Sequence, residues 1–154
     1  MRRGFTLVEI LIVVVILGVL AAVVVPQFAS ASDDSKIGAF VSSIRSLEEG
    51  LEMHHARTGQ MVADSSSGNF PPELAGIIRE SEWRRGPSIG GEWDVESGAG
   101  GIVTYGVGVH FSGGGDWAND TAMTRIDAVL DDGDVETGAF RRIAGGRYYL
   151  VLQP

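Results

Sequence analysis

The first third of the chain combines a continuous apolar stretch with a periodic apolar stripe. No polar side chain occurs between residues 10 and 25, and Glu9 stands directly before this stretch. A helix over residues 5–25 would be about 30 Å long at about 1.5 Å per residue, which matches the hydrocarbon thickness of a bilayer. The pattern therefore predicts a transmembrane helix over residues 5–25.

The helical pattern continues beyond the apolar stretch. Apolar residues recur there at spacings of three and four, which places them on one stripe of an amphipathic helix: Ile37, Phe40, Val41, Ile44, Leu47 and Leu51. A Thr-Gly pair at residues 58–59 supplies a stop signal, so we expect one helix from Phe5 to about Arg57, with residues 26–58 as its amphipathic half. Pro26 would bend this helix by removing one hydrogen bond. The alternative is that Pro26 ends the membrane helix and starts a linker.

A period of two replaces the helical period in the second half of the chain. Strands are predicted over four segments separated by turn residues: 92–95, 102–111, 139–143 and 147–152. The last two form a hairpin at Gly145-Gly146, and alternate positions of the second strand present an apolar face to the amphipathic helix. A short helix is predicted over residues 121–130, with Asp120 as its cap. The head, residues 59–154, is then α+β: a long helix packed on a small antiparallel sheet.

Charge and composition narrow the function classes. The 154 residues carry a formal net charge of −8 and no cysteine. Beyond Arg2 and Arg3 the basic residues are dispersed among acids, which argues against a nucleic-acid surface. The lack of cysteine excludes disulfides, thiol catalysis and thiolate metal sites. The basic start, with Asp33 and Asp34 beyond the apolar stretch, places the N-terminus in the cytoplasm and the rest of the chain outside it.

Two ordinary interpretations of the apolar segment stay open. A cleaved signal peptide also has a basic start, and Ala29-Ser30-Ala31 could be its cleavage site, but its apolar stretch is usually only about 7–15 residues long. A plain single-pass anchor is the other interpretation. Neither explains Gly4-Phe5 or Glu9, a carboxylate that costs about 2.5–3.5 kcal/mol in hydrocarbon.

The segment Gly4-Phe5-Thr6-Leu7-Val8-Glu9-Ile10 resembles the processing and assembly signature of type IV pilins and type II secretion pseudopilins. The resemblance covers about the first 55 residues. It implies that a prepilin peptidase removes residues 1–4 by cleaving between Gly4 and Phe5, and methylates the new N-terminus. It also implies that the carboxylate of Glu9 meets the α-amino group of Phe5 of a neighbouring subunit. The alternative is that Glu9 snorkels to water.

The same resemblance implies a structural subunit of a pilus or pseudopilus, and not an enzyme. In a filament, the long helix of this family can kink or locally melt at the position of Pro26. The implied partners are other copies of the chain, other pilin-like subunits, the prepilin peptidase and an inner-membrane assembly platform. The implied location is the bacterial inner membrane, with a single span, a cytoplasmic N-terminus and a periplasmic head, and then the filament.

The lack of cysteine favours a pseudopilin of type II secretion, because many type IV pilins close a C-terminal loop with a disulfide. The alternative function is that of a minor type IV pilin, whose head binds a surface, a sugar or a secreted substrate.

Carboxylates are concentrated in residues 131–136, directly after the predicted short helix. Calcium takes several oxygen ligands on flexible loops, and the resemblance implies such a site because major pseudopilins hold calcium in a C-terminal loop. Asp131, Asp132 and Asp134 are therefore candidate calcium ligands, and no other cofactor is expected. The spacing is not that of an EF-hand, and the alternative is an acidic turn that is only solvated.

Three further groups of residues could carry chemistry. His54 and His55 point about 100° apart on a helix, so they are poorly placed to share a metal, and we expect both on the helix surface. No histidine or aspartate partner can be placed near Ser65–Ser67, so a catalytic triad is not predicted. The three tryptophans could form a binding platform, with core packing as the alternative: Trp83, Trp93 and Trp117.

Overall fold

The computed structural model describes residues 5–99, 103–143 and 145–153. The chain forms two compact units, residues 1–35 and residues 36–154. The predicted leader with Gly4, and Ile102 at the start of the predicted second strand, lie outside the described residues.

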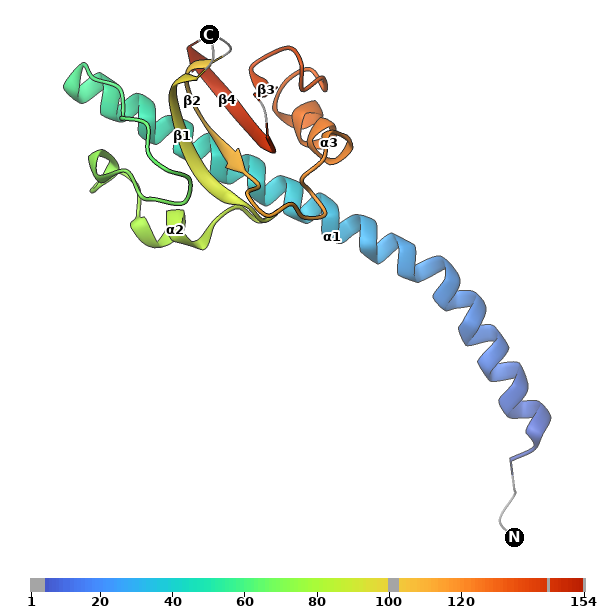
Figure 1. Ribbon diagram of the computed structural model, residues 1–154. Coiled ribbons are helices and arrows are strands. Elements are labelled where there is room, and N and C mark those ends of the chain that lie inside the picture. The colour runs from blue at the N-terminus through green and yellow to red at the C-terminus, as the bar shows by residue number, and fades with distance from the viewer. Residues whose placement is uncertain (1–4, 100–102, 144, 154) are drawn as a thin grey trace. The chain divides into compact units, whose positions relative to one another are not determined.

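One helix, α1, runs over Leu7–Thr58 (Figure 1). The predicted single helix is confirmed, with small differences at its two ends. Pro26 lies inside α1, so the interpretation in which it ends the membrane helix is wrong. Every residue from 5 to 25 is exposed, and within the described residues α1 is the helix that is long and apolar enough to cross a membrane.

The second half of α1 buries the predicted apolar stripe. All six residues of this stripe are buried except Val41, which is partly buried. The buried face continues to Gly50 and His54, and the side chain of His54 is only 8% exposed. The expectation that His54 lies on the helix surface is wrong, because position 54 follows Leu47 and Leu51 at helical spacing. The neighbouring histidine is exposed, as expected.

Four antiparallel strands form one sheet in the order β1-β2-β4-β3. Their bounds are Glu92–Ala99 for β1, Val103–His110 for β2, Phe140–Arg142 for β3 and Arg147–Gln153 for β4. The pairing of Phe140 with Leu150 confirms the predicted hairpin between the last two strands. The first strand is longer than the predicted segment 92–95.

Both edge strands form a hydrogen bond away from the sheet. The backbone N–H of Gly68 donates to the carbonyl oxygen of Trp93 on β1, at 2.8 Å. The backbone N–H of Arg142 on β3 donates to the carbonyl oxygen of Val135, also at 2.8 Å. Irregular segments of the chain therefore contact the sheet at both of its edges.

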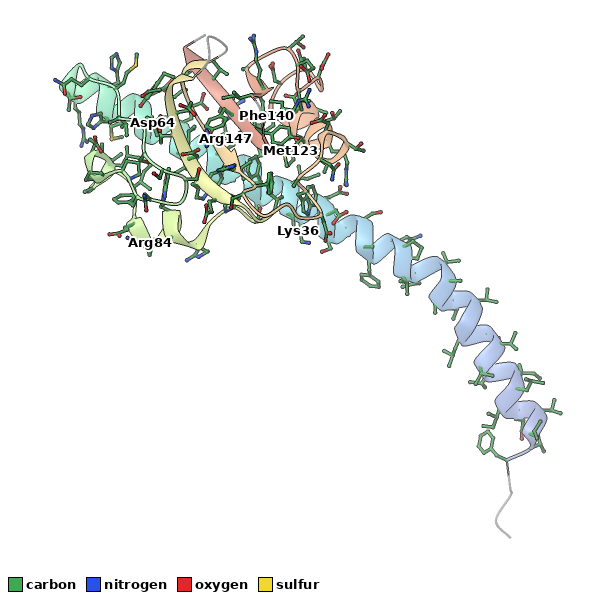
Figure 2. The ribbon with its side chains drawn as sticks, viewed as in Figure 1. Lys36, Asp64, Arg84, Met123, Phe140 and Arg147 are labelled. Carbon is green, nitrogen blue, oxygen red and sulfur yellow. The ribbon has the colours of Figure 1, made fainter. Side chains whose placement is uncertain are left out.

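The hydrophobic core lies between α1 and one face of the sheet. Phe40 stacks on Trp93 with ring centroids 5.5 Å apart, and it meets Phe140 edge-on at 6.3 Å. Phe140 and Met123 are fully buried (Figure 2). The inward positions of β2 are buried as well, which confirms the predicted packing of this strand on the helix: Tyr105, Val107 and Val109. The fold is the expected α+β arrangement.

Three short helical elements complete the head: η1 over Pro72–Leu74, α2 over Glu80–Arg85 and α3 over Asp120–Leu130. The predicted helix over residues 121–130 is confirmed as α3, whereas α2 was not predicted. The cap of α3 is Asn119 and not Asp120, because the side chain of Asn119 accepts a hydrogen bond from the N–H of Ala122 at 2.9 Å. Asn119 has the extended backbone that an N-cap needs, and Asp120 is already helical.

Candidate functional site

The start of α1 is closed by a reciprocal pair of hydrogen-bonding residues, Thr6 and Glu9. Both the backbone N–H and the hydroxyl of Thr6 donate to Oε2 of Glu9 at 2.8 Å. The N–H of Glu9 donates back to the Thr6 hydroxyl oxygen at 3.2 Å. This is a capping box, which satisfies backbone donors that a helix start leaves without partners.

The capping box leaves one oxygen of Glu9 available. Both bonds from Thr6 end on Oε2, and within the described residues no hydrogen bond to Oε1 is found. Glu9 can therefore accept a further donor without giving up its cap. Thr6 was missed as a site residue, although Thr-x-x-Glu ahead of an apolar run is a recognisable capping signal in the sequence.

A second candidate site lies where α3 ends. Oxygen atoms of Asp127, Asp131 and Asp132 lie within 4.8 Å of one another. Asp127 is fully buried, and neither of its carboxylate oxygens has a hydrogen-bond partner within the described chain. Asp131 accepts a hydrogen bond from the N–H of Ala139, and Asp132 accepts one from the N–H of Asp134 at 2.9 Å.

Of the three predicted calcium ligands, the structure brings two together. Asp131 and Asp132 belong to the group, whereas Asp134 does not and instead accepts a hydrogen bond from the N–H of Glu136 at 3.0 Å. Asp127 takes the third place and was missed. The signal in the sequence is that Asp127 lies on the apolar stripe of α3, beside the buried residues Ile126 and Leu130.

The electrostatics of this group favour a proton or a cation at Asp127. Burial, and then the charges of Asp132 and Asp131, raise the pKa of Asp127 to about 6. The pKa of Asp132 is lowered, because the backbone of Asp134 and the hydroxyl of Thr137 donate to its carboxylate. Three carboxylates of this kind form a set of hard oxygen ligands, which suits a divalent cation such as calcium.

The remaining predicted groups have structural roles. The three tryptophans are only 2%, 3% and 7% exposed, so the interpretation as core residues is favoured over a binding platform. Ser67 does have histidine and aspartate neighbours, so that expectation is wrong: its Oγ lies 2.7 Å from Nδ1 of His110 and 3.0 Å from Oδ2 of Asp94. The serine bonds the aspartate directly, whereas a catalytic triad places the imidazole between them.

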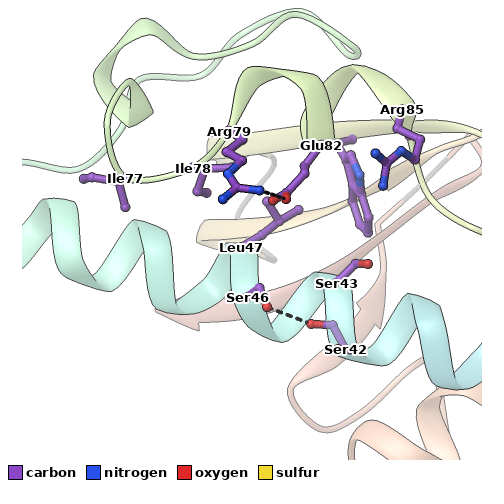
Figure 3. Close-up of a pocket in the computed structure, with 11 residues that line it drawn as sticks. Ser42, Ser43, Ser46, Leu47, Ile77, Ile78, Arg79, Glu82 and Arg85 are labelled. Carbon is purple, nitrogen blue, oxygen red and sulfur yellow. Dashed lines mark hydrogen bonds and ion pairs between the residues drawn. The ribbon is translucent and has the colours of Figure 1, made fainter.

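A groove of about 480 Å³ lies between α1 and α2 (Figure 3). Serine hydroxyls of α1 face it, together with Arg79, Glu82 and Arg85 of the opposite wall. Arg79 and Glu82 form an ion pair at 3.6 Å. The groove therefore offers polar contacts from both of its walls.

Comparisons with known proteins bear on both halves of the chain. A family model described as the prokaryotic N-terminal methylation motif matches residues 1–25. The chain is 45% identical over 105 residues to the type II secretion system core protein G of Klebsiella michiganensis, a match that covers 62% of this chain and 74% of that protein.

Two further relatives carry the same name. The protein of Escherichia coli K12 is 36% identical over 94 residues, covering 56% of this chain and 65% of its own length. The protein of Pseudomonas aeruginosa is 49% identical over 53 residues, covering 34% of this chain and 37% of its own length. The chain therefore spans less than two thirds of the length of each of these two relatives. No solved structure matches the chain significantly.

Proposed function

The chain belongs to the family of the type II secretion system core protein G, and on this basis we propose that it is a structural subunit of a pseudopilus that serves type II protein secretion. The observation that carries the proposal is the apolar segment of residues 5–25, in which every residue is exposed. An apolar surface of this length requires cover from lipid or from other helices. A subunit that moves from the membrane into a filament would use both.

Processing would precede assembly. In this proposal a prepilin peptidase cuts between Gly4 and Phe5 at the cytoplasmic face and methylates the new N-terminus, with the head in the periplasm. The match of the methylation motif to residues 1–25 supports this step. Intact-mass analysis of the membrane-extracted protein tests it, and we expect a chain that begins at methylated Phe5. A mature chain with any other first residue would refute the processing step.

Assembly would then proceed through the helices. Oε1 of Glu9, which the capping box leaves available, would accept the α-amino group of Phe5 from a neighbouring copy, so that two charges neutralise each other in an apolar environment. Pro26 would let α1 adjust inside the filament. The partners are further copies, other pilin-like subunits and an inner-membrane assembly platform, and the chain itself is proposed to be scaffold and not enzyme.

We further propose that the group of Asp127, Asp131 and Asp132 holds calcium. The fit rests on Asp127, whose two buried oxygens have no hydrogen-bond partner within the described chain. A bound cation would satisfy them and would neutralise the three carboxylates. Its role would be structural, because it would tie the end of α3 to the loop that follows.

Isothermal titration of the purified chain with calcium tests this site. We expect one equivalent to bind, and Asp127→Asn to abolish binding. Asp134→Asn is the matched control, since Asp134 lies outside the group, and it should bind as the wild type does. Loss of binding in the control with retention in Asp127→Asn would refute the assignment of ligands. A minor pilin with a binding head is the less favoured function, because the tryptophans that could have formed a platform are buried.

A further inference from the structure

The C-terminal end of α3 gathers negative charge without a cation in its own last turn. That turn contains no basic residue, and Asp127, Asp131 and Asp132 lie within it or directly after it. A helix C-terminus also carries partial negative charge, because its last carbonyl groups lack hydrogen-bond partners within the helix. Carboxylates are therefore unfavourable at this end of α3, and a cation from another element would stabilise it.

The long helix α1 supplies such a cation. The guanidinium of Arg45 donates through Nη2 to the carbonyl oxygen of Leu130 at 3.0 Å, although the two residues are 85 positions apart in the chain. Leu130 is the last residue of α3. A basic side chain at a helix C-terminus stabilises the helix in this way, because it bonds the last carbonyls and opposes the dipole. Here the arginine comes from a different helix.

The side chain of Arg45 is held in place on α1. The preceding residue, Ile44, is fully buried in the core. Nη1 of Arg45 forms an ion pair with Oε2 of Glu48 at 2.8 Å, three residues further along the helix. Because one nitrogen of the planar guanidinium is held by Glu48, less rotamer freedom is lost when the other nitrogen bonds Leu130.

Leu130 lies between residues of the proposed calcium group. It directly precedes Asp131, and the N–H of Asp131 donates to the carbonyl oxygen of Asp127 at 2.6 Å. Asp131 has an irregular backbone, with φ −152° and ψ −115°, and not the left-handed glycine that commonly ends a helix. A helix end without that cap relies on other bonds to keep its shape, and Arg45 provides one of them.

We propose that Arg45 is a positioning residue for calcium, which holds the carbonyl of Leu130 so that Asp131 and Asp132 stay close to Asp127. This inference rests on the calcium site proposed above. Arg45 and a bound calcium ion would both fix the same end of α3, so each would strengthen the binding of the other. Such coupling is reciprocal, and it would link occupancy of the site to α1.

The charge of Arg45 by itself leads to the opposite expectation. A guanidinium near a calcium site repels the divalent cation, so its removal would raise the affinity for calcium if charge were its only effect. Loss of a residue that orients a metal ligand instead lowers the affinity, commonly by about 10–100-fold. The direction of the change therefore distinguishes positioning from simple electrostatics.

Isothermal titration of the full chain in detergent micelles with calcium chloride measures this direction. Arg45→Met keeps the length of the side chain but removes its charge and its donors, and we expect the affinity for calcium to fall roughly tenfold. Arg45→Lys keeps the charge and a donor, so it should restore most of the affinity.

Arg79→Met is the matched control for this titration. Arg79 also pairs with a glutamate three residues later, Glu82, at 3.6 Å, but no hydrogen bond from Arg79 to α3 occurs within the described residues. We expect this variant to bind calcium as the wild type does. Circular dichroism checks that all the variants fold.

Hydrogen–deuterium exchange of the wild-type chain gives a second test that needs no variant. We expect calcium to slow exchange in peptides over residues 127–139 and also in those over residues 42–49 of α1, with little change in β4. In Arg45→Met, calcium should still slow exchange in the first set but no longer in α1.

The outcomes separate this inference from the calcium site itself. If the wild type binds calcium and Arg45→Met binds it equally or more tightly, the positioning role is refuted and the site stands. The role is also refuted if calcium leaves exchange in α1 of the wild type unchanged. A wild-type chain that binds no calcium would instead overturn the site, and the role of Arg45 with it.

Discussion

At the scale of single residues, the chain places carboxylates where they need partners. The carboxylate of Glu9 accepts hydrogen bonds from Thr6 at the start of its own helix. Within the described residues, the carboxylate of Asp127 has no hydrogen-bond partner. The two carboxylates have opposite effects on stability. An exposed capping carboxylate strengthens a helix, whereas a buried carboxylate without donors destabilises the fold unless it binds a proton or a cation.

The variant Asp127→Asn, measured in the absence of calcium, tests how much the buried carboxylate destabilises the fold. The pKa of Asp127 is raised to about 6, so the stability that its proton contributes is fully present below its ordinary value and is lost as the pH rises through about 6. We expect the variant to match the wild type at about pH 4 and to be more stable by about 1 kcal/mol at about pH 7. Thermal unfolding in EDTA, followed by circular dichroism, measures the difference. An equal pH dependence in both proteins would contradict the argument.

At the scale of elements, two glycines have opposite roles. A Cβ on Gly108 would lie 2.7 Å from the Cα of Tyr149, so this strand position admits no side chain. Gly38 in α1 has nothing within 4 Å of such a Cβ. The first glycine is required by packing, and the second only weakens its helix.

Gly108→Ala should therefore separate β2 from β4. We expect a loss of about 2–4 kcal/mol in the free energy of unfolding, because backbone atoms cannot move aside as a flexible side chain can. Gly38→Ala is the control and should gain up to about 1 kcal/mol through helix propensity. Urea unfolding of the two variants measures both effects. A Gly108→Ala protein as stable as the wild type would show that the strands tolerate the clash.

The elements also show what the sequence could predict. The long helix and the apolar face of β2 follow from periodicity, which depends only on neighbours along the chain. The burial of Asp94 and Glu96 does not, because alternation along β1 marks both as solvent-facing and carries no information about Ser67, whose hydroxyl donates to Asp94. The contact of Ser67 with His110 joins residues 43 positions apart. Asp134 was chosen over Asp127 for a similar reason, since a run of acids in the sequence does not show which oxygens converge.

At the scale of the whole molecule, the proposed filament depends on one charge. Glu9→Ala should still insert into the membrane, because it only makes the span more apolar. It should assemble at least roughly tenfold less, since the amino group of Phe5 on the neighbouring copy would have no partner in an apolar environment. Sheared-filament yield at equal membrane content measures this, with Glu49→Ala, an exposed acid of the same helix, as control. Normal yield from Glu9→Ala would count against the pairing.

The two outward hydrogen bonds at the sheet edges have a consequence for crowding. If subunits are stored in one membrane plane, as the proposed function requires, they would meet at high local concentration, where an open strand edge would recruit the edge of a neighbour and lead to aggregation. Here the backbone of Gly68 hydrogen-bonds Trp93 at the edge of β1, and the backbone of Val135 hydrogen-bonds Arg142 at the edge of β3. In the proposed pseudopilus, these bonds would keep the sheets of neighbouring heads from pairing at these two positions, and polymerisation would then depend on the helices.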